Sequence, residues 1–218
     1  MPRTNKDFSF RKEQLIKLAL EQFVEKGYES TTITDLQKSF GLTKGGLYHY
    51  FNSKEDILDA VIEYGLAEGA LELAAELESI PLEKRLIHVF FHSVTNDFTQ
   101  RLFQYSKQSG ASIVAYRLRE KTMQFTIGIL KDIVREYVET GFYQTQYPDE
   151  MIAFSVVLAM TITDEGMLPQ TDFNRRKNHV DALLDLWSRC MRPPPEHMDE
   201  LRMNLYGLIG FDDEEREN

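Results

Sequence analysis

Residues 31–54 constrain the fold of this chain more than any other stretch, because their pattern is that of two short helices separated by a tight turn. Thr31 or Thr32 can cap the first helix with its hydroxyl group. Gly41 suits the turn because glycine adopts positive φ without steric cost, and Thr43 can cap the second helix. This order of elements predicts a helix-turn-helix, the motif whose second helix enters the major groove of DNA.

The remainder of the chain is helical in pattern as well. Apolar residues recur every three or four positions, and no stretch shows the convincing alternation that is typical of a strand. Glycine, proline and serine mark the expected helix ends, and Ser53 can cap a helix together with Asp56. The sequence therefore predicts an all-α protein. Outside the motif, helices are expected over residues 9–26, 54–79, 82–98, 100–107, 112–140, 148–167, 172–191 and 196–209.

This pattern divides the chain into three parts. We expect an N-terminal head of three helices at residues 1–53, a helical body at residues 54–210 and an acidic, frayed tail at residues 211–218. The helix over residues 54–79 connects head and body in this scheme. No low-complexity linker separates them, so the head is expected to pack on the body through that helix.

The net charge of −10 is unevenly distributed along the chain. Residues 1–60 contain nine basic and nine acidic side chains, whereas residues 61–218 contain 16 basic and 26 acidic ones. The first seventeen residues carry a local excess of three positive charges. A small basic surface suffices for DNA phosphates if a dimer doubles it, and an acidic body would repel DNA and orient the head toward it.

Composition and motifs exclude several classes of protein. The single cysteine, Cys190, cannot form an intramolecular disulfide and is typical of a reducing compartment. The N-terminus lacks a signal-peptide core, and the apolar run over residues 152–162 is shorter than the about 20 residues of a membrane span. We find no nucleophile with its base, no phosphate loop and no paired acids. The sequence therefore predicts a cytoplasmic protein that is not an enzyme and has no cofactor.

Residue types within the motif suit contact with DNA. Thr43 can offer its hydroxyl to a phosphate, and Lys44 can reach a phosphate or the edge of a guanine. Gly45 has no side chain, so the backbone can approach the groove closely. Tyr48 combines an apolar ring with a hydroxyl that can reach a phosphate, and Lys54 can neutralise a further phosphate.

Other residues of the motif are expected to pack against one another. Leu36, Leu42, Leu47 and Phe51 are apolar at spacings that would hold three short helices together. Tyr50 can either pack in this core or turn its hydroxyl toward a phosphate, and the sequence leaves both roles open.

Three segments, Gly27–Ile33, Gly41–Phe51 and Lys54–Leu58, resemble the N-terminal domain of the TetR/AcrR family of transcriptional repressors. Their order, spacing and residue types agree with that domain over roughly residues 10–62. One departure is Lys38–Phe40, where the family more often has small apolar residues, and the phenylalanine is expected to repack the core slightly.

The resemblance implies an all-α homodimer that docks its motif helices in successive major grooves of a palindromic double-stranded DNA operator. It also implies that the body is a ligand-binding and dimerisation domain, in which a small-molecule effector releases the DNA. The implied function is a DNA-binding transcriptional repressor. By position, the expected DNA contacts are Thr32, Thr43, Lys44, Gly45, Tyr48, His49 and Lys54.

The dimer is expected to form through the last two long helices, residues 148–167 and 172–191, as a four-helix interface with their symmetry mates. The run from Ile152 to Met160 contains more apolar residues than one buried face requires. This excess suits a helix that packs both on its own body and on a partner. A central core helix would produce the same pattern, so that alternative stays open.

A small-molecule site is expected between the helices over residues 82–98, 112–140 and 148–167, where aromatic residues are frequent. Acids facing such a pocket would favour a cationic ligand, whereas acids at helix ends would simply face water. The polar side chains in these stretches are His88, His92, Asp97, Asp164 and Glu165. The first candidates for ligand contacts are Phe91, Phe98, Tyr116, Phe125 and Met160.

Two further interpretations stay open. His88 and His92 lie four residues apart, a spacing found in metal sites, so a metal- or haem-responsive regulator of the same fold is an alternative. No cysteine lies near this pair, and the two rings can equally hydrogen-bond within the core, so no metal ligands are assigned. The body can also be an architectural or protein-interaction module that binds no small molecule.

Overall fold

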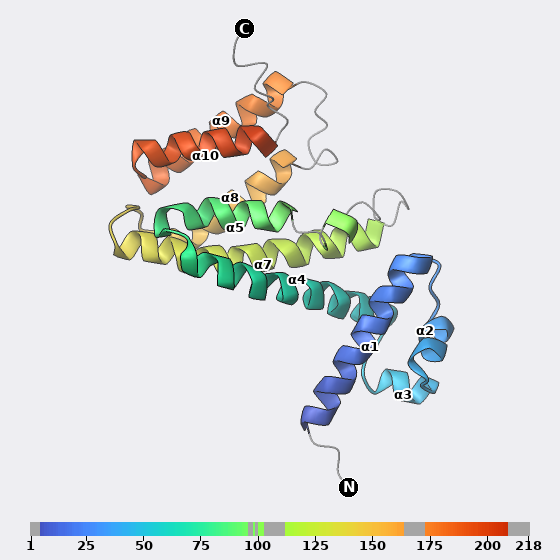
Figure 1. The fold of residues 1–218 in the computed structure, drawn as a ribbon. Helices are drawn as coiled ribbons and strands as arrows, with labels where there is room; N and C mark the ends of the chain where they lie inside the picture. Colours follow the sequence, from blue (N-terminus) through green and yellow to red (C-terminus); the bar gives the residue numbers. More distant parts are fainter. Residues whose placement is uncertain (1–4, 96–97, 99, 103–111, 164–172, 209–218) are drawn as a thin grey trace. The chain divides into compact units, whose positions relative to one another are not determined.

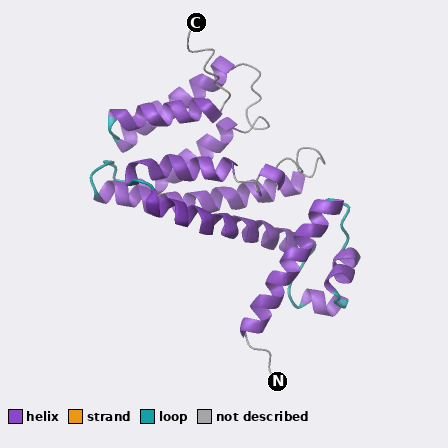
Figure 2. Cartoon of the chain, in the orientation of Figure 1, coloured by secondary structure: helices purple, strands orange, loops and turns teal. Residues whose placement is uncertain are grey.

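The computed structural model describes residues 5–95, 98, 100–102, 112–163 and 173–208. All regular elements in these ranges are α-helices, as Figure 2 shows, so the prediction of an all-α protein is confirmed. The chain divides into two compact units. The first consists of Met1–Ala74 and Val94–Thr122, and the second of Ala75–Ser93 and Met123–Asn218.

Three helices begin the first unit, and Figure 1 shows the two short ones beside the long one. They are α1 (Asn5–Lys26), α2 (Ile33–Phe40) and α3 (Lys44–Tyr48). Gly27 ends α1 at a φ of +83°, a conformation that favours glycine. The expected start of α1 at residue 9 is wrong by one turn, because the helix already begins at Asn5.

These three helices share one apolar core. Leu36, Leu47 and Phe51 are buried as predicted, and Leu42 is half-buried. Phe40, the departure from the family pattern, is only 2% exposed, so the core accommodates its ring fully. The residues that α1 contributes to this core are Leu15, Ala19 and Phe23.

Helix α4 (Lys54–Ser79) follows the head and begins with the predicted cap. Ser53 Oγ accepts a hydrogen bond from the backbone N–H of Asp56 at 3.1 Å. The Asp56 carboxylate in turn accepts a bond from the backbone N–H of Asn52 at 2.8 Å, one residue before the cap. The reciprocal pair of bonds is therefore a variant of the capping box.

Ion pairs hold α4 to the first turns of α7 (Ser112–Glu139) within the first unit. Arg117 Nη1 lies 3.4 Å from Asp59 Oδ2, and Lys121 Nζ lies 2.6 Å from Glu63 Oε1. These contacts bring a segment from the middle of the chain onto the helix that follows the head.

The second unit contains the remaining helices. Figure 1 shows α9 and α10 side by side, and α9 also packs on α8. Residues 96–97 and 164–167 of the expected extensions to residues 98 and 167, and residues 103–107 of the expected short helix, lie outside the described residues. The helix bounds are Leu82–Thr95 for α5, Pro148–Thr163 for α8, Phe173–Met191 for α9 and Pro195–Leu208 for α10.

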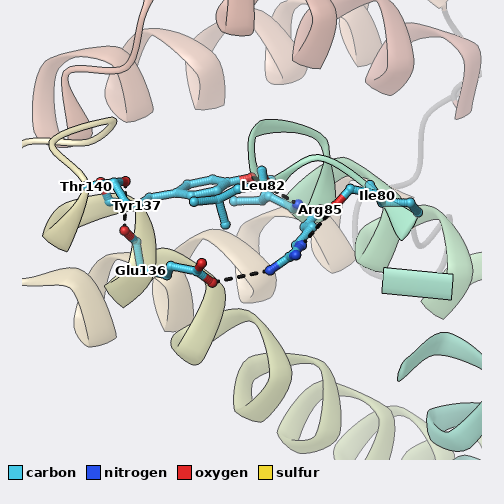
Figure 3. A network of polar contacts seen from close by, with 7 residues as sticks. Ile80, Leu82, Arg85, Glu136, Tyr137 and Thr140 are labelled. Atoms are coloured by element: carbon cyan, nitrogen blue, oxygen red, sulfur yellow. Dashed lines mark hydrogen bonds and ion pairs between the residues drawn. The ribbon is translucent and has the colours of Figure 1, made fainter. Parts of the chain in front are cut away.

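Polar contacts tie the start of α5 to the end of α7, as Figure 3 shows. Tyr137 Oη donates to the carbonyl of Leu82 at 2.6 Å, which satisfies the hydroxyl of a fully buried ring. Arg85 Nε donates to the carbonyl of Ile80 at 3.1 Å, and Arg85 Nη1 lies 3.3 Å from Glu136 Oε2. These contacts hold the turn between α4 and α5 against the end of α7.

A histidine and a tyrosine form a buried hydrogen bond deeper in this unit. His197 Nε2 lies 2.6 Å from Tyr143 Oη. Burial lowers the pKa of His197 from 6.5 to about 4 and raises the pKa of Tyr143 well above its ordinary value. Both side chains are therefore neutral near pH 7, and the pair adds no buried charge.

Candidate nucleic-acid interface

The start of α2 is fixed by a complete capping box. Thr32 Oγ1 accepts a hydrogen bond from the backbone N–H of Asp35 at 3.1 Å. The Asp35 carboxylate accepts bonds from the backbone N–H and the hydroxyl of Thr32, at 2.9 and 2.6 Å. These bonds hold the pKa of Asp35 below its ordinary value. Because the hydroxyl of Thr32 already donates to Asp35, a phosphate contact through it requires that bond to be exchanged.

The neighbouring Thr31 has a different role from the cap. It is fully buried, and its hydroxyl donates to the carbonyl of Gly27 at 2.7 Å. Of the two threonines that the sequence left open, Thr32 is therefore the cap of α2 and Thr31 closes the turn after α1.

The turn between α2 and α3 has the predicted geometry. Gly41 has φ +63° and ψ +33°, and its N–H donates to the carbonyl of Lys38 at 3.2 Å. Thr43 caps α3, since its Oγ1 accepts a bond from the N–H of Gly46 at 3.2 Å. The Thr43 side chain is exposed, and a hydroxyl that accepts one bond can still donate another.

One side chain anchors α3, and its other side chains are accessible. Leu47 is 1% exposed, whereas Lys44, Gly45 and Tyr48 lie on the surface, with Tyr48 44% exposed. A Cβ atom added at Gly45 would meet no atom within 4 Å, so its Cα faces open space. The structure thus brings four expected DNA contacts together on one exposed helix, with Thr43 at its start.

The end of α3 is supported by a ring that the sequence analysis missed. Phe8 of α1 stacks on Tyr50 at a centroid distance of 4.8 Å and meets the ring of His49 edge-on at 5.4 Å. Tyr50 is 9% exposed, so its ring packs in the head, whereas His49 is exposed. The signal that could have found Phe8 is a large apolar residue just before the expected helix start.

Lys54 differs from the other expected DNA contacts in its surroundings. Its ammonium group lies 4.1 Å from the centroid of the Tyr28 ring and 3.4 Å from the carbonyl oxygen of Glu29. Partial burial lowers the pKa of Lys54. A phosphate contact by Lys54 must therefore share an ammonium group that the loop after α1 already holds.

The expected ligand contacts do not gather at one place. A cavity lies in the second unit between α5, α7, α8, α9 and α10, and Phe91 is the one expected contact among the described residues that line it. Phe125 and Met160 are half-buried elsewhere in that unit. Phe98 and Tyr116 belong to the first unit, where the Phe98 ring packs against Gly65 and Tyr116 is 58% exposed.

The side chains of His88 and His92 both approach the carboxylate of Glu76. His88 Nε2 lies 2.6 Å from Glu76 Oε2, and His92 Nδ1 lies 3.8 Å from the same oxygen. Within the described part of the chain, no group of three such side chains is arranged to hold a metal ion. The three remaining polar candidates, Asp97, Asp164 and Glu165, lie outside the described residues.

The sequence matches known proteins most clearly over the head. Residues 15–61 match the family model of bacterial regulatory proteins of the tetR family. The HTH-type transcriptional repressor KstR2 of Mycolicibacterium smegmatis is 33% identical over 85 residues, which cover 38% of this chain and 42% of that protein. The KstR2 repressor of Mycobacterium tuberculosis is 25% identical over 162 residues, 70% of this chain and 78% of that protein. The first of these alignments thus spans less than half of the relative.

A likeness of the fold extends beyond the head. A TetR-family transcriptional regulator from Pectobacterium atrosepticum superposes with a TM-score of 0.58 at 21% identity, over 88% of this chain and all of that one. Within the described ranges, every helix is too short or too polar to cross a membrane. Because the sequence match falls on the residues that build the helix-turn-helix, residues 15–61 carry the N-terminal domain of the tetR family of regulators, and the likeness of the chain to a TetR-family regulator beyond them is one of fold.

Proposed function

We propose that this protein is a transcriptional repressor that binds a palindromic DNA operator as a homodimer and releases it when a small molecule binds. Residues 1–53 form the DNA-reading head in this proposal, and residues 54–210 form the ligand-binding and dimerisation domain. The observation that carries the proposal is the exposed surface of α3. The buried side chain of Leu47 anchors this helix to the head, and Thr43 caps its N-terminus.

The chemistry of this surface favours DNA over other partners. Lys44 supplies a positive charge, and the hydroxyls of Thr43 and Tyr48 supply donors for phosphate oxygens. The open space at Gly45 allows the backbone to approach the groove. His49 adds an exposed ring whose nitrogens can meet a phosphate or a base edge.

The proposed dimer rests on helix α8, which has two apolar faces. Ile152 and Val156 are each 2% exposed and pack inside the second unit. Phe154, Val157 and Leu158 recur at helical spacing on another face and are 62%, 44% and 40% exposed. An exposed apolar stripe of this kind is typical of an interface, and a second copy of the chain is the partner that we propose for it.

Selection of bound sequences from a random DNA pool tests the DNA-reading function. Wild type is expected to enrich a palindrome, and Tyr48→Ala is expected to weaken binding to all sequences because it removes a phosphate contact. Tyr147→Ala is the matched control, since Tyr147 is also exposed, at 62%, but lies in the second unit. Enrichment by wild type and Tyr48→Ala alike would contradict the proposed docking through α3.

A further inference from the structure

The cavity in the second unit has a volume of about 60 Å³ and is lined by apolar side chains from five helices. Leu130 of α7 and Ile152 and Val156 of α8 are each no more than 2% exposed. These side chains line a concave space in the unit, whereas Phe91 and Leu205 in the same lining are half-buried, so the cavity is partly open to solvent. The cavity is therefore suited to a small molecule rather than to a docking protein.

The described lining of the cavity offers no opposite charge to an ionised ligand. Among the described residues that line it, none has a charged side chain. Ser155 Oγ already donates to the carbonyl of Met151 and Asn204 Nδ2 to the carbonyl of Glu200, both at 2.7 Å. A charged ligand would lose its hydration and find no opposite charge among these residues, and water would find few hydrogen-bond partners.

The aromatic residues of the lining add a preference for apolar surface. Phe91 and Trp187 come from α5 and α9, on two of the five helices. The indole Nε1 of Trp187 lies near the hydroxyl of Tyr143, although the two groups do not meet in hydrogen-bonding geometry. Apart from this indole N–H, which has no hydrogen-bond partner among the described residues, recognition in this cavity rests on shape and apolar contact.

We propose that this cavity is the effector site and that it binds an uncharged, apolar small molecule, an inference that rests on the proposed ligand-responsive repressor. The described lining contains no acid that would favour a cationic ligand, and the candidate acids Asp97, Asp164 and Glu165 lie outside the described residues. The site also differs from the expected one, since α9 and α10 contribute to it in addition to α5, α7 and α8.

The size of the cavity has a consequence for how binding acts. Ligand pockets commonly measure about 300–1,000 Å³, so a cavity of about 60 Å³ must enlarge to hold most effectors. Helix α9 packs on both α8 and α10, so we expect enlargement to shift α9 against one of these neighbours. Because α8 carries the proposed dimer surface, the effector would change the pairing of the two copies and thereby the placement of their heads.

The chain carries its own reporter for this site. Trp187 is its single tryptophan and lines the cavity, so emission excited where the tyrosines do not absorb reports on the surroundings of this cavity. Three probes of similar size separate charge from shape: toluene is uncharged, benzoate is an anion and benzylammonium is a cation. Titration of the full chain with each probe, followed by Trp187 emission and by calorimetry, measures the preference directly.

Variants of two lining residues shift the volume in opposite directions. Ala159→Leu places extra atoms in the cavity and is expected to abolish toluene binding, whereas Leu184→Ala enlarges it and is expected to strengthen binding severalfold. Ala159 and Leu184 are 7% and 3% exposed. Leu186→Ala, on the same helix as Leu184 but 44% exposed, is the matched control and should leave the affinity unchanged.

The inference is supported if Leu184→Ala binds toluene more tightly than wild type and Ala159→Leu does not bind it. Benzoate and benzylammonium must also bind wild type at least tenfold more weakly than toluene. Equal affinity for a charged probe, or toluene binding that neither variant changes, overturns it. An operator obtained by selection from random DNA then allows the ligand class and the repressor function to be tested separately. Toluene that binds without releasing the operator leaves the ligand class standing and contradicts effector-driven release, whereas a protein that selects no DNA contradicts the repressor alone.

Discussion

At the scale of single residues, two phenylalanines near the start of α1 have opposite environments. Phe8 contacts the rings of His49 and Tyr50, whereas Phe10, two positions later, is 63% exposed. Because α3 is only five residues long, its last turn gains little stability from its own backbone. Phe8 is therefore a positioning residue that sets where the His49 ring lies.

Replacement of Phe8 tests this role against a purely structural one. Phe8→Ala is expected to lower the free energy of unfolding by about 1–2 kcal/mol and to reduce the discrimination between operator and random DNA. Phe8→Tyr should restore both, and Phe10→Ala should change neither. Urea unfolding and competition binding measure the two quantities. A loss of stability without any loss of discrimination would show that Phe8 only packs.

The buried His197 makes stability depend on pH. Its pKa is about 4 in the folded protein and about 6.5 in the unfolded chain, so the unfolded state binds the proton more readily. The contribution is therefore fully present above pH 6.5 and is lost as the pH falls toward 4, by up to about 3 kcal/mol. Urea unfolding at pH 7.5 and pH 4.5 should show a smaller decrease for His197→Gln than for wild type. Equal decreases would contradict the assignment.

At the scale of elements, the helix-turn-helix contains glycines with different physical roles. Gly41 has a φ of +63°, which side chains rarely adopt, whereas Gly45 lies in helical backbone with open space beside it. The first glycine is thus required by the turn. The second is not required by the backbone, and in our proposal it allows DNA to approach α3 closely.

Alanine at these positions should separate folding from DNA binding. Gly41→Ala is expected to destabilise the protein by about 1–2 kcal/mol. Gly45→Ala should keep or raise stability by up to about 1 kcal/mol, since alanine favours a helix, yet weaken operator binding. Gly128→Ala, also helical and open, should raise stability without affecting binding. Thermal unfolding and operator titration give both values, and unchanged DNA affinity in Gly45→Ala would contradict close approach at that residue.

The elements themselves could largely be predicted, because their ends are set by local chemistry. Thr32, Thr43 and Ser53 cap helices where the sequence placed them, since a hydroxyl at the right spacing is a local signal. The extra turn of α1 was missed because Phe8 is stabilised by rings 41 and 42 positions away in sequence. The partner of the histidine pair, Glu76, was missed for the same reason, as it lies on another helix.

At the scale of the whole molecule, the apolar stripe of α8 governs assembly in our proposal. Phe154→Asp places a charge at its most exposed position, 62% accessible, and is expected to give monomers at micromolar concentration. Leu71→Asp on α4, at a residue 70% exposed, is the control and should leave a dimer. Sedimentation velocity distinguishes these outcomes. Monomeric wild type would refute the dimer itself.

The sequence predicted a cavity with aromatic residues in its lining, but not the full set of helices that form it. Aromatic content pointed to α5, α7 and α8, and of the candidates Phe91 does line it. The contributions of Trp187 and of α10 depend on how the last helices fold back, which periodicity does not encode. Phe98 and Tyr116 were indistinguishable from lining residues in the sequence, because a helical apolar pattern does not tell which neighbour each face meets.

The single anchor of α3 has a consequence for evolution. Only Leu47 in that helix is buried, so its other positions can change without disturbing the core. If these residues contact DNA as we propose, mutations at positions 44, 45 and 48 would alter recognition with little penalty to folding. A lineage could then acquire a new target site stepwise without passing through unstable intermediates. A combinatorial library at these positions should consist mostly of folded proteins, each with its own preferred DNA.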